Sequence, residues 1–380
     1  MQKILSIFGT RPEAIKMAPV VRELSRYPEE IKSVICVTAQ HREMLDQVLE
    51  LFNIHPDHDL NLMKPDQSLA SLTANALIGL DLIIGKVKPD WVLVQGDTTT
   101  VTAASLIAFY HRVKVGHVEA GLRTRDKYQP FPEEINRRIT DVISDLYFAP
   151  TAGARQNLLN EGTPAENIHV TGNTVIDSLL EVAARDYDWK SGPLSGIPTE
   201  KRLVMITAHR RENFGEPFRN ICLAIRDLAS RYTDSCHFIY PVHMNPNVQA
   251  PVREILSNIS NISLIEPLDY LPLVQLMRHS TLILTDSGGI QEEAPSLGKP
   301  VLVLRETTER NEVIEAGVAR LVGTDRKKIF DSASELLDNE KAYAAMAHKA
   351  NPFGDGLAAS RIVNILRNNF ESVNLKFPRT

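Results

Sequence analysis

Short apolar runs alternate with longer amphipathic segments along almost the whole chain. Runs of this length bounded by Gly, Pro or Asp are typical of buried strands, and the segments between them have the periodicity of amphipathic helices. The alternation predicts an α/β fold built from parallel strands and connecting helices. The expected strands are residues 3–8, 31–38, 90–95, 114–118, 146–149, 168–170, 202–207, 237–241, 261–265, 281–285 and 301–304.

The alternation lapses once, between residues 186 and 200, where the chain is rich in Gly, Pro and Ser. A new series of strands and helices begins after this lapse, which predicts two doubly wound, Rossmann-like domains facing a central cleft. Gly354 and Gly356 have no strand before them, so they are interpreted as a hinge and not as a dinucleotide-binding turn. The final helix is expected to follow this hinge and to pack back on the first domain. The expected domains are residues 1–171 with 355–380, and residues 172–354.

The segment Ser287-Gly288-Gly289 follows a predicted strand and precedes residues that favour a helix. Adjacent glycines allow a ligand to approach the backbone, and the free N–H groups of a helix N-terminus favour phosphate. Ser287 could cap this helix and donate to the same phosphate, although a plain strand-to-helix turn is an equal alternative. The carboxylates of Glu292 and Glu293 are unsuited to phosphate, so one of them is expected to accept hydrogen bonds from ribose hydroxyl groups.

Other charged side chains also follow predicted strands. Arg11 and Lys16 lie at the start of a helix, where cations suit a bound anion, with solvated surface charges as the alternative. Asp97 and Glu119 each come directly after a strand, which places two carboxylates at neighbouring strand ends. Asp97 is also well placed to be a helix N-cap, and His117 is more easily explained as a core or supporting histidine than as a catalytic one.

Four further residues are candidates for the site. Glu133 and Glu134 occupy the first turn of a predicted helix, which the helix dipole alone would explain, but one of the pair could carry a proton. His209 lies just past a strand end and could act as an acid, a base or a donor to phosphate. His243 also follows a strand and is as readily a turn anchor as a ligand.

Composition excludes several classes of function. The 42 basic and 47 acidic residues give a net charge of −5, which provides no basic field for nucleic acid. No apolar run approaches the roughly 18 residues that a membrane span requires, and the N-terminus lacks the features of a signal peptide, so a cytoplasmic protein without membrane contact is expected. The histidines lack metal-site spacing and no nicotinamide site is predicted, so neither a metal nor a cofactor is expected. The three cysteines are interpreted as buried free thiols.

Several long motifs resemble those of the bacterial non-hydrolysing UDP-N-acetylglucosamine 2-epimerases, and together they cover nearly the whole chain. They are Phe8-Gly-Thr-Arg-Pro-Glu-Ala-Ile-Lys-Met-Ala-Pro19, Thr38-Ala-Gln-His-Arg-Glu-Met-Leu-Asp-Gln47, Gly96-Asp-Thr-Thr-Thr100, Gly116-His-Val-Glu-Ala-Gly-Leu-Arg-Thr124, Pro132-Glu-Glu134, Gly172-Asn-Thr174 and Thr285-Asp-Ser-Gly-Gly-Ile-Gln-Glu-Glu-Ala-Pro-Ser-Leu-Gly298.

The resemblance implies a GT-B architecture, a homodimer, and reversible conversion of UDP-GlcNAc to UDP-ManNAc for cell-surface polysaccharides. The reaction would eliminate UDP to give a 2-acetamidoglucal and then add UDP back. The implied catalytic residues are Asp97, Glu119, Glu133 and His209, of which His209 would stabilise the leaving diphosphate. The implied nucleotide-binding residues are Arg11, Lys16, Ser287, Gly288, Gly289, Glu293 and Arg310. Which carboxylate is the acid and which is the base stays open.

The family also suggests an allosteric UDP-GlcNAc site, to which Gln40, Arg210 and His243 correspond. Glu43 and Asp66 stand where some relatives have Gln and Arg, so reduced or absent activation by substrate is expected. Two other functions remain as alternatives: a GT-B glycosyltransferase that uses a UDP-sugar donor, which would need an acceptor, and a non-catalytic nucleotide-sugar sensor, which would tolerate loss of the carboxylates.

Overall fold

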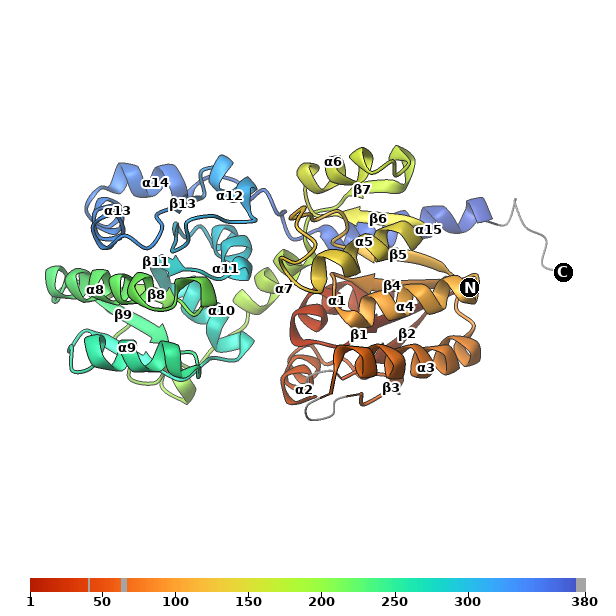
Figure 1. Cartoon of the computed structure of the whole chain (residues 1–380), viewed down its shortest axis with the longest axis horizontal. Coiled ribbons are helices and arrows are strands. Elements are labelled where there is room, and N and C mark those ends of the chain that lie inside the picture. The colour runs from red at the N-terminus through yellow and green to blue at the C-terminus, as the bar shows by residue number, and fades with distance from the viewer. Residues whose placement is uncertain (40–41, 63–66, 374–380) are drawn as a thin grey trace. The chain divides into compact units, whose positions relative to one another are not determined.

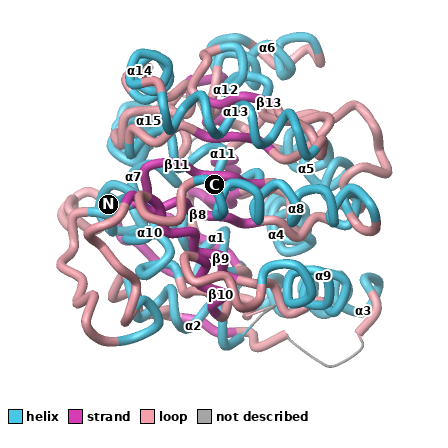
Figure 2. The backbone as a smooth tube through the Cα atoms, turned by 90° about the vertical axis from the view of Figure 1, so that its left-hand side faces the viewer, coloured by secondary structure: helices cyan, strands magenta, loops and turns pink. Residues whose placement is uncertain are grey.

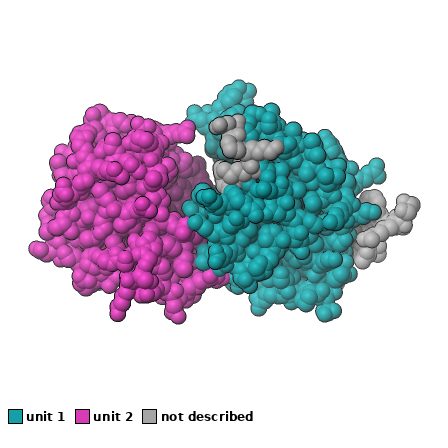
Figure 3. Space-filling model, turned by 90° about the horizontal axis from the view of Figure 1, so that it is seen from below, with its two compact units in different colours: residues 1–178, 353–380 teal, residues 179–352 magenta. Residues whose placement is uncertain are grey.

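The structure, a computed structural model, describes residues 1–39, 42–62 and 67–373. The chain forms two compact units, Met1–Ser178 with Phe353–Thr380, and Leu179–Pro352 (Figure 3). The divisions expected from the sequence are 171/172 and 354/355. Each unit contains one parallel sheet with helices around it, and in the tube view the strands lie between the helices (Figure 2).

Unit 1 contains a seven-stranded sheet in the order β3-β2-β1-β4-β5-β6-β7 (Figure 1). Its strands are β1 (Gln2–Phe8), β2 (Ile31–Val37), β3 (His58–Asp59), β4 (Trp91–Gln95), β5 (Lys114–Val118), β6 (Leu146–Ala149) and β7 (Ile168–Val170). Its helices are α1 (Arg11–Leu24), α2 (Arg42–Leu51), α3 (Leu69–Val87), α4 (Thr99–Tyr110), α5 (Glu133–Ile143), α6 (Ala152–Asn160) and α15 (Ala358–Val373), and α7 (Thr174–Ala183) continues into unit 2.

Helices cover the unit 1 sheet because its strands are apolar on both faces. Every residue of β4 is buried, as expected for a central parallel strand. Leu5 and Val92 of the sheet share one core with Leu80 of α3 and Ala104 of α4. Figure 1 shows α3, α4 and α5 side by side along one face of this sheet. Because helices cover the faces of the sheet, the polar residues that follow the strands lie at its carboxyl edge.

Unit 2 contains a six-stranded sheet in the order β10-β9-β8-β11-β12-β13. Its strands are β8 (Arg202–Thr207), β9 (Cys236–Pro241), β10 (Ile262–Ile265), β11 (Ser280–Thr285), β12 (Val301–Val303) and β13 (Ala319–Leu321). Its helices are α8 (Glu216–Arg231), α9 (Pro246–Leu256), α10 (Tyr270–His279), α11 (Gly288–Glu293), α12 (Asn311–Glu315), α13 (Arg326–Asp338) and α14 (Glu340–Ala347).

The structure confirms the two doubly wound α/β sheets and all the expected strands, with shifts of one residue at some ends. Two strands were missed, β3 and β13, because two or three residues that include charged or polar side chains produce no apolar run. Gly354 and Gly356 have positive φ angles of 131° and 82°, and α15 begins two residues later and packs on α1, as predicted. Cys36, Cys222 and Cys236 are free and buried, also as predicted.

The expectation that no segment is long and apolar enough for a membrane span does not hold for one helix. Among the described residues, α3 is a 19-residue helix that is long and apolar enough to cross a membrane by length and composition alone. The search for uninterrupted apolar runs missed it because Gly, Ser, Thr and one Asp interrupt its apolar residues. Core helices of globular proteins pass the same test, and Ala76, Leu80 and Ile84 of α3 do pack in the unit 1 core.

Candidate functional site

Glu119 lies at the carboxyl end of β5 and is fixed by several donors. Lys16 Nζ lies 2.5 and 2.7 Å from its two carboxylate oxygens. Asn173 donates to Oε1 at 2.8 Å, and Gln95 donates to Oε2. The backbone of Glu119 has a positive φ of 67°, which is rare for a residue with a side chain and is often found at functional sites. Glu119 is therefore an oriented acceptor paired with a cation.

Asp97 lies beside this pair, at the end of β4. Burial raises the pKa of Asp97, the Arg137 guanidinium lowers it, and the nearby charge of Glu119 raises it further, for a net increase. Arg137 Nη1 is 3.2 Å from its Oδ2. The alternative that Asp97 is the N-cap of α4 was wrong: Thr98 is the N-cap, and its hydroxyl accepts from the N–H of Val101. Asp97 is thus available as a proton carrier.

The two glutamates at the start of α5 have different surroundings. Glu134 is buried, accepts from the N–H groups of Thr124 and Arg125 at 3.0 and 3.3 Å, and pairs with Arg137 at 3.0 Å, so it anchors the preceding loop. Oε2 of Glu133 is buried and has no hydrogen-bond partner among the described residues. Of the pair, Glu133 is therefore the one with an oxygen available to a substrate.

Hydrogen bonds at the start of α1 connect the turns that follow β1 and β4. The carboxylate of Glu13 accepts from Thr10 N and Thr10 Oγ1 at 2.7 and 2.6 Å, which forms a capping box at the start of the helix. Thr98 also donates to Glu13, which connects the turn after β4 to the turn after β1. His117 is completely buried between Asp141, at 2.6 Å, and the carbonyl of Gly96, at 2.8 Å, which confirms its supporting role.

In unit 2, His209 follows β8 and lies against the end of β11. Its Nδ1 is 3.7 Å from Oδ1 of Asp286, and its ring stacks on that of His243 with centroids 5.2 Å apart. Burial lowers the pKa of His209, Asp286 raises it and His243 lowers it, for a net decrease. Nδ1 of His243 accepts from the N–H of Asn245, so His243 is a turn anchor as well as a neighbour of His209.

The turn Ser287-Gly288-Gly289 begins α11 after β11. Ser287 occupies the N-cap position, but its side chain makes no capping hydrogen bond, contrary to the expected cap. A Cβ on Gly288 would lie 3.2 Å from Cζ of Arg310, so glycine allows this guanidinium to approach the turn. Arg310 is directed by Glu292 at 2.8 Å and Glu309 at 2.7 Å. The glycine turn and the guanidinium of Arg310 therefore lie next to each other in unit 2.

Glu293 and Glu292 have separate roles in this region. The hydroxyl of Tyr270 donates to Oε2 of Glu293 at 3.2 Å, whereas Glu292 pairs with Arg310. The α-helix α11 ends just before Pro295, and the chain continues as a short 3-10 helix, Ala294–Leu297. Glu292 is therefore the carboxylate that directs Arg310 toward the glycine turn, and Glu293 lies against Tyr270.

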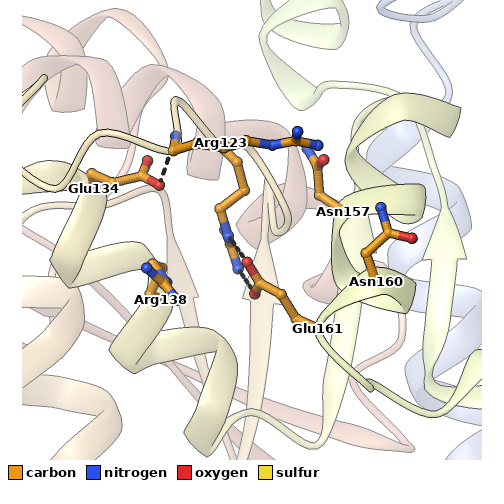
Figure 4. Close-up of a pocket in the computed structure, with 7 residues that line it drawn as sticks. Arg123, Glu134, Arg138, Asn157, Asn160 and Glu161 are labelled. Atoms are coloured by element: carbon orange, nitrogen blue, oxygen red, sulfur yellow. Dashed lines mark hydrogen bonds and ion pairs between the residues drawn. The ribbon is translucent and has the colours of Figure 1, made fainter.

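A separate hollow of about 390 Å³ lies on unit 1 next to the loop that precedes α5 (Figure 4). It is lined by Arg123, Arg125, Glu134, Arg138, Asn157, Asn160 and Glu161. The guanidinium of Arg123 is paired with Glu161 at 2.7 Å and Asp141 at 2.6 Å. These ion pairs connect the loop to α5 and to the end of α6. The charged side chains at the hollow therefore have a structural role.

Sequence reasoning missed several residues that contact the predicted ones, among them Gln95, Arg137, Asn173 and Asp286. Gln95 was counted as the last residue of an apolar strand. Arg137 lies four residues after Glu133, and this helical spacing would have indicated a shared face. Asp286 directly follows β11, so the strand-end rule applied to every strand would have found it.

The structure brings Lys16, Asp97 and Glu119 together in unit 1, and Gly288, Glu293 and Arg310 together in unit 2. Arg11 makes no ion pair or hydrogen bond with its side chain within the described ranges, and Gln40 lies outside them. No group of three or more metal-binding side chains is arranged to hold a metal ion in the described part of the chain.

Comparison with known proteins gives one consistent family. The family model described as UDP-N-acetylglucosamine 2-epimerase matches residues 22–367. The UDP-N-acetylglucosamine 2-epimerase of Escherichia coli K12 is 54% identical over 375 residues, covering 97% of this chain and 99% of that protein. The Bacillus subtilis enzyme of the same name is 53% identical over 364 residues, covering 96% and 94%.

A solved structure extends this result to the fold. The UDP-GlcNAc 2-epimerase from Neisseria meningitidis, in a crystal structure with bound UDP-GlcNAc, is 50% identical and superposes with a TM-score of 0.86. The similarity covers 97% of this chain and 100% of that one. Since both the sequence and the two-sheet fold match over nearly their full length, the chain belongs to the UDP-N-acetylglucosamine 2-epimerase family.

Proposed function

We propose that the chain interconverts UDP-GlcNAc and UDP-ManNAc by inverting C2 of the sugar. The observation that carries the proposal is the pair of carboxylates at the ends of β4 and β5. Glu119 is oriented by Lys16, and Asp97 beside it has a pKa raised by burial and by the charge of Glu119. Carboxylates in such different surroundings suit a reaction that moves a proton at neutral pH.

The chemistry of the sugar favours elimination over simple proton exchange. C2 has no adjacent carbonyl group, so its proton is only weakly acidic. When a carboxylate takes that proton, the C2–H electrons form the C1=C2 bond and the C1–O electrons leave with UDP. The product is a 2-acetamidoglucal. Addition of UDP at C1, with proton delivery to the opposite face of C2, then gives the epimer.

We assign the proton transfers to Asp97 and Glu133. Asp97 has the raised pKa, and Glu133 has a buried oxygen without a partner among the described residues. Glu119 and Lys16 form a fixed ion pair, and in this assignment they orient the sugar and balance charge. Substitution of Asp97 and of Glu133, one at a time, distinguishes their roles. The stereochemistry at C2 of the products of each variant shows which carboxylate acts on which face.

The leaving UDP needs cations and donors, and we assign these to both units. Arg11 and Lys16 lie at the start of α1. The turn after β11 consists of Ser287, Gly288 and Gly289, and Arg310 lies beside it. His209 stabilises the departing diphosphate, and Glu293 accepts hydrogen bonds from the ribose.

We further propose that the protein is a homodimer formed through one helical face of unit 1. On α3, α4 and α5, which lie side by side in Figure 1, several large apolar side chains are exposed. They are Ile78, Leu82, Phe109, Tyr110, Ile135, Ile139 and Val142. We call this set the α3–α5 face. Exposed apolar side chains on neighbouring helices of a folded unit indicate an interaction site, and a second copy of the chain supplies an equally apolar partner.

Incubation with UDP-GlcNAc in D₂O tests the main proposal. Elimination and addition incorporate deuterium at C2 of both epimers, without any sugar acceptor. Turnover that leaves C2 unlabelled contradicts the elimination route, and turnover that occurs only with an added acceptor indicates a glycosyltransferase. Mass spectrometry and proton NMR of the isolated nucleotide sugars distinguish these outcomes.

A further inference from the structure

We propose that Asn173 is a positioning residue for Glu119, and that it makes the orientation of this carboxylate depend on the segment that returns at Phe353. This inference rests on the proposed epimerase function. All the residues that carry it belong to unit 1. Asn173 lies in the connection between β7 and α7, just before the chain enters unit 2.

The amide of Asn173 has its orientation fixed by its neighbours. The N–H of Val175 donates to Oδ1 at 3.1 Å, so the oxygen must face the start of α7. Nδ2 therefore faces the other way and donates to Oε1 of Glu119 at 2.8 Å. Because an N–H group can only donate and an ionised carboxylate can only accept, a flipped amide would lose both bonds. The side chain is 2% exposed, so water does not replace these contacts.

Glu119 needs such a directional partner. Its positive φ of 67° is unfavourable for a residue with a Cβ and persists only where neighbours fix it. Lys16 contacts both oxygens, but an ammonium group acts as a point charge and does not set the plane of a carboxylate. Asn173 bonds Oε1 and Gln95 bonds Oε2, so the two amides together determine that plane. Loss of the Asn173 amide removes the directional donor to Oε1 of Glu119.

The backbone of Asn173 connects this carboxylate to the returning segment. Its N–H donates to the carbonyl of Phe353 at 2.7 Å, and Phe353 is buried. A Cβ on Gly172 would lie 3.3 Å from that carbonyl oxygen and 3.4 Å from Cα of Gly354. Glycines at both positions therefore allow the two segments to lie close together. The position of Phe353 thus influences Asn173, and through Asn173 it influences Glu119.

The test compares variants that separate the cap of α7 from the bond to Glu119. In Asn173→Ser, the shorter hydroxyl still accepts from the start of α7, as serine does at helix N-caps, but cannot reach Glu119. We expect kcat to fall at least tenfold, with the KM for UDP-GlcNAc changed less than twofold. Asn173→Ala, which loses both contacts, should show the same kcat and a lower melting temperature.

Asn261 provides the matched control. It is also 2% exposed, and its Nδ2 donates to the carbonyls of Ala229 and Cys236 in unit 2. Asn261→Ala should lower the melting temperature and leave kcat of the folded protein unchanged. Wild-type kcat in Asn173→Ser, or an equal loss of kcat in Asn261→Ala, overturns the positioning role. Failure of the wild type to epimerise UDP-GlcNAc overturns the proposed function instead, which is a separate result.

Discussion

Oδ1 of Asp286 lies 3.7 Å from Nδ1 of His209, and Asp286 has no exposed surface. Its other oxygen accepts from the backbone N–H groups of His209 and Arg210, at 2.8 Å each. One buried carboxylate therefore fixes the backbone of the turn after β8 and faces the ring of its histidine. The charge of Asp286 favours the protonated ring of His209 and so opposes the effect of burial, as the proposed role beside a leaving diphosphate requires.

Asp286→Asn should lower the pKa of His209. Burial already lowers this pKa, and the charge of Asp286 opposes that effect. Without the charge of Asp286, burial lowers the pKa of His209 further. His243→Asn should have the opposite sign, because the stacked His243 lowers the pKa. An NMR titration of the His209 ring measures both shifts. A higher pKa in Asp286→Asn would show that the 3.7 Å contact does not act electrostatically.

Arg137→Met should move one limb of the pH–rate profile to higher pH. Burial raises the pKa of Asp97 and Arg137 lowers it, so removal of the guanidinium raises it further. If Asp97 must be ionised to react, the acidic limb moves; if it must be protonated, the alkaline limb moves. Profiles of kcat between pH 5 and 10 provide the measurement.

Arg138 is the matched control for this change. It lies next to Arg137 on α5 but is exposed and has no ion-pair partner in the described ranges. Arg138→Met should leave both limbs in place. Equal shifts in the two variants would attribute the effect to net charge and not to the Asp97 contact.

The sequence predicted the strands and most of the site because both depend on local patterns. Apolar runs locate β4 and β11, and the strand-end rule then locates Asp97, Glu119 and the glycine turn. The contacts of Asn173 could not be predicted in this way, because Asn173 and Glu119 are far apart in the chain and meet only when the sheet forms. Spacing likewise could not distinguish Glu133 from Glu134. Their difference arises from the loop N–H groups that Glu134 accepts in the folded chain.

Leu82→Glu should dissociate the proposed dimer. Leu82 is 68% exposed on the α3–α5 face, so a charge there costs the monomer little but would be buried against the second copy. Light scattering coupled to gel filtration should give a mass near 42.4 kDa for the variant and twice this value for the wild type. Exposed Leu357, outside this face, is the control, and Leu357→Glu should leave the mass unchanged. A wild-type mass of one chain at micromolar concentration contradicts the proposal.

Initial rates should depend hyperbolically on UDP-GlcNAc concentration. Glu43 and Asp66 stand where some relatives have Gln and Arg, and two added carboxylates would repel the diphosphate of a second UDP-GlcNAc. Gln40, which corresponds to the same site, and Asp66 lie outside the described residues. A Glu43→Gln, Asp66→Arg double variant should restore sigmoidal kinetics, because it removes two negative charges and adds one positive charge. Steep sigmoidal kinetics in the wild type would contradict the prediction.

Unit 1 should become more stable as the pH falls from 7.5 to 5, through Asp177. This carboxylate accepts from the N–H groups of Ala358 and Ala359, at 3.2 and 2.9 Å, and so connects α7 to the start of α15. Burial raises the pKa of Asp177 to about 6, and these two hydrogen bonds reduce the increase. A carboxyl group whose pKa is higher in the folded state stabilises that state when protonated. Its contribution is complete below about pH 4 and is lost as the pH rises through about 6.

The size of this effect is limited to about 3 kcal/mol, since each pKa unit corresponds to roughly 1.4 kcal/mol and the group is partly exposed. Asp177→Asn cannot take up the proton, so its stability should change less between pH 7.5 and 5 than that of the wild type. The chain has two tryptophans, and Trp189→Phe leaves Trp91, which is buried in β4, as the reporter of unit 1. Urea unfolding at both pH values, followed by Trp91 fluorescence, gives the comparison. If the stability of the two proteins changes equally between pH 7.5 and 5, the Asp177 carboxylate that caps α15 keeps its charge across this range.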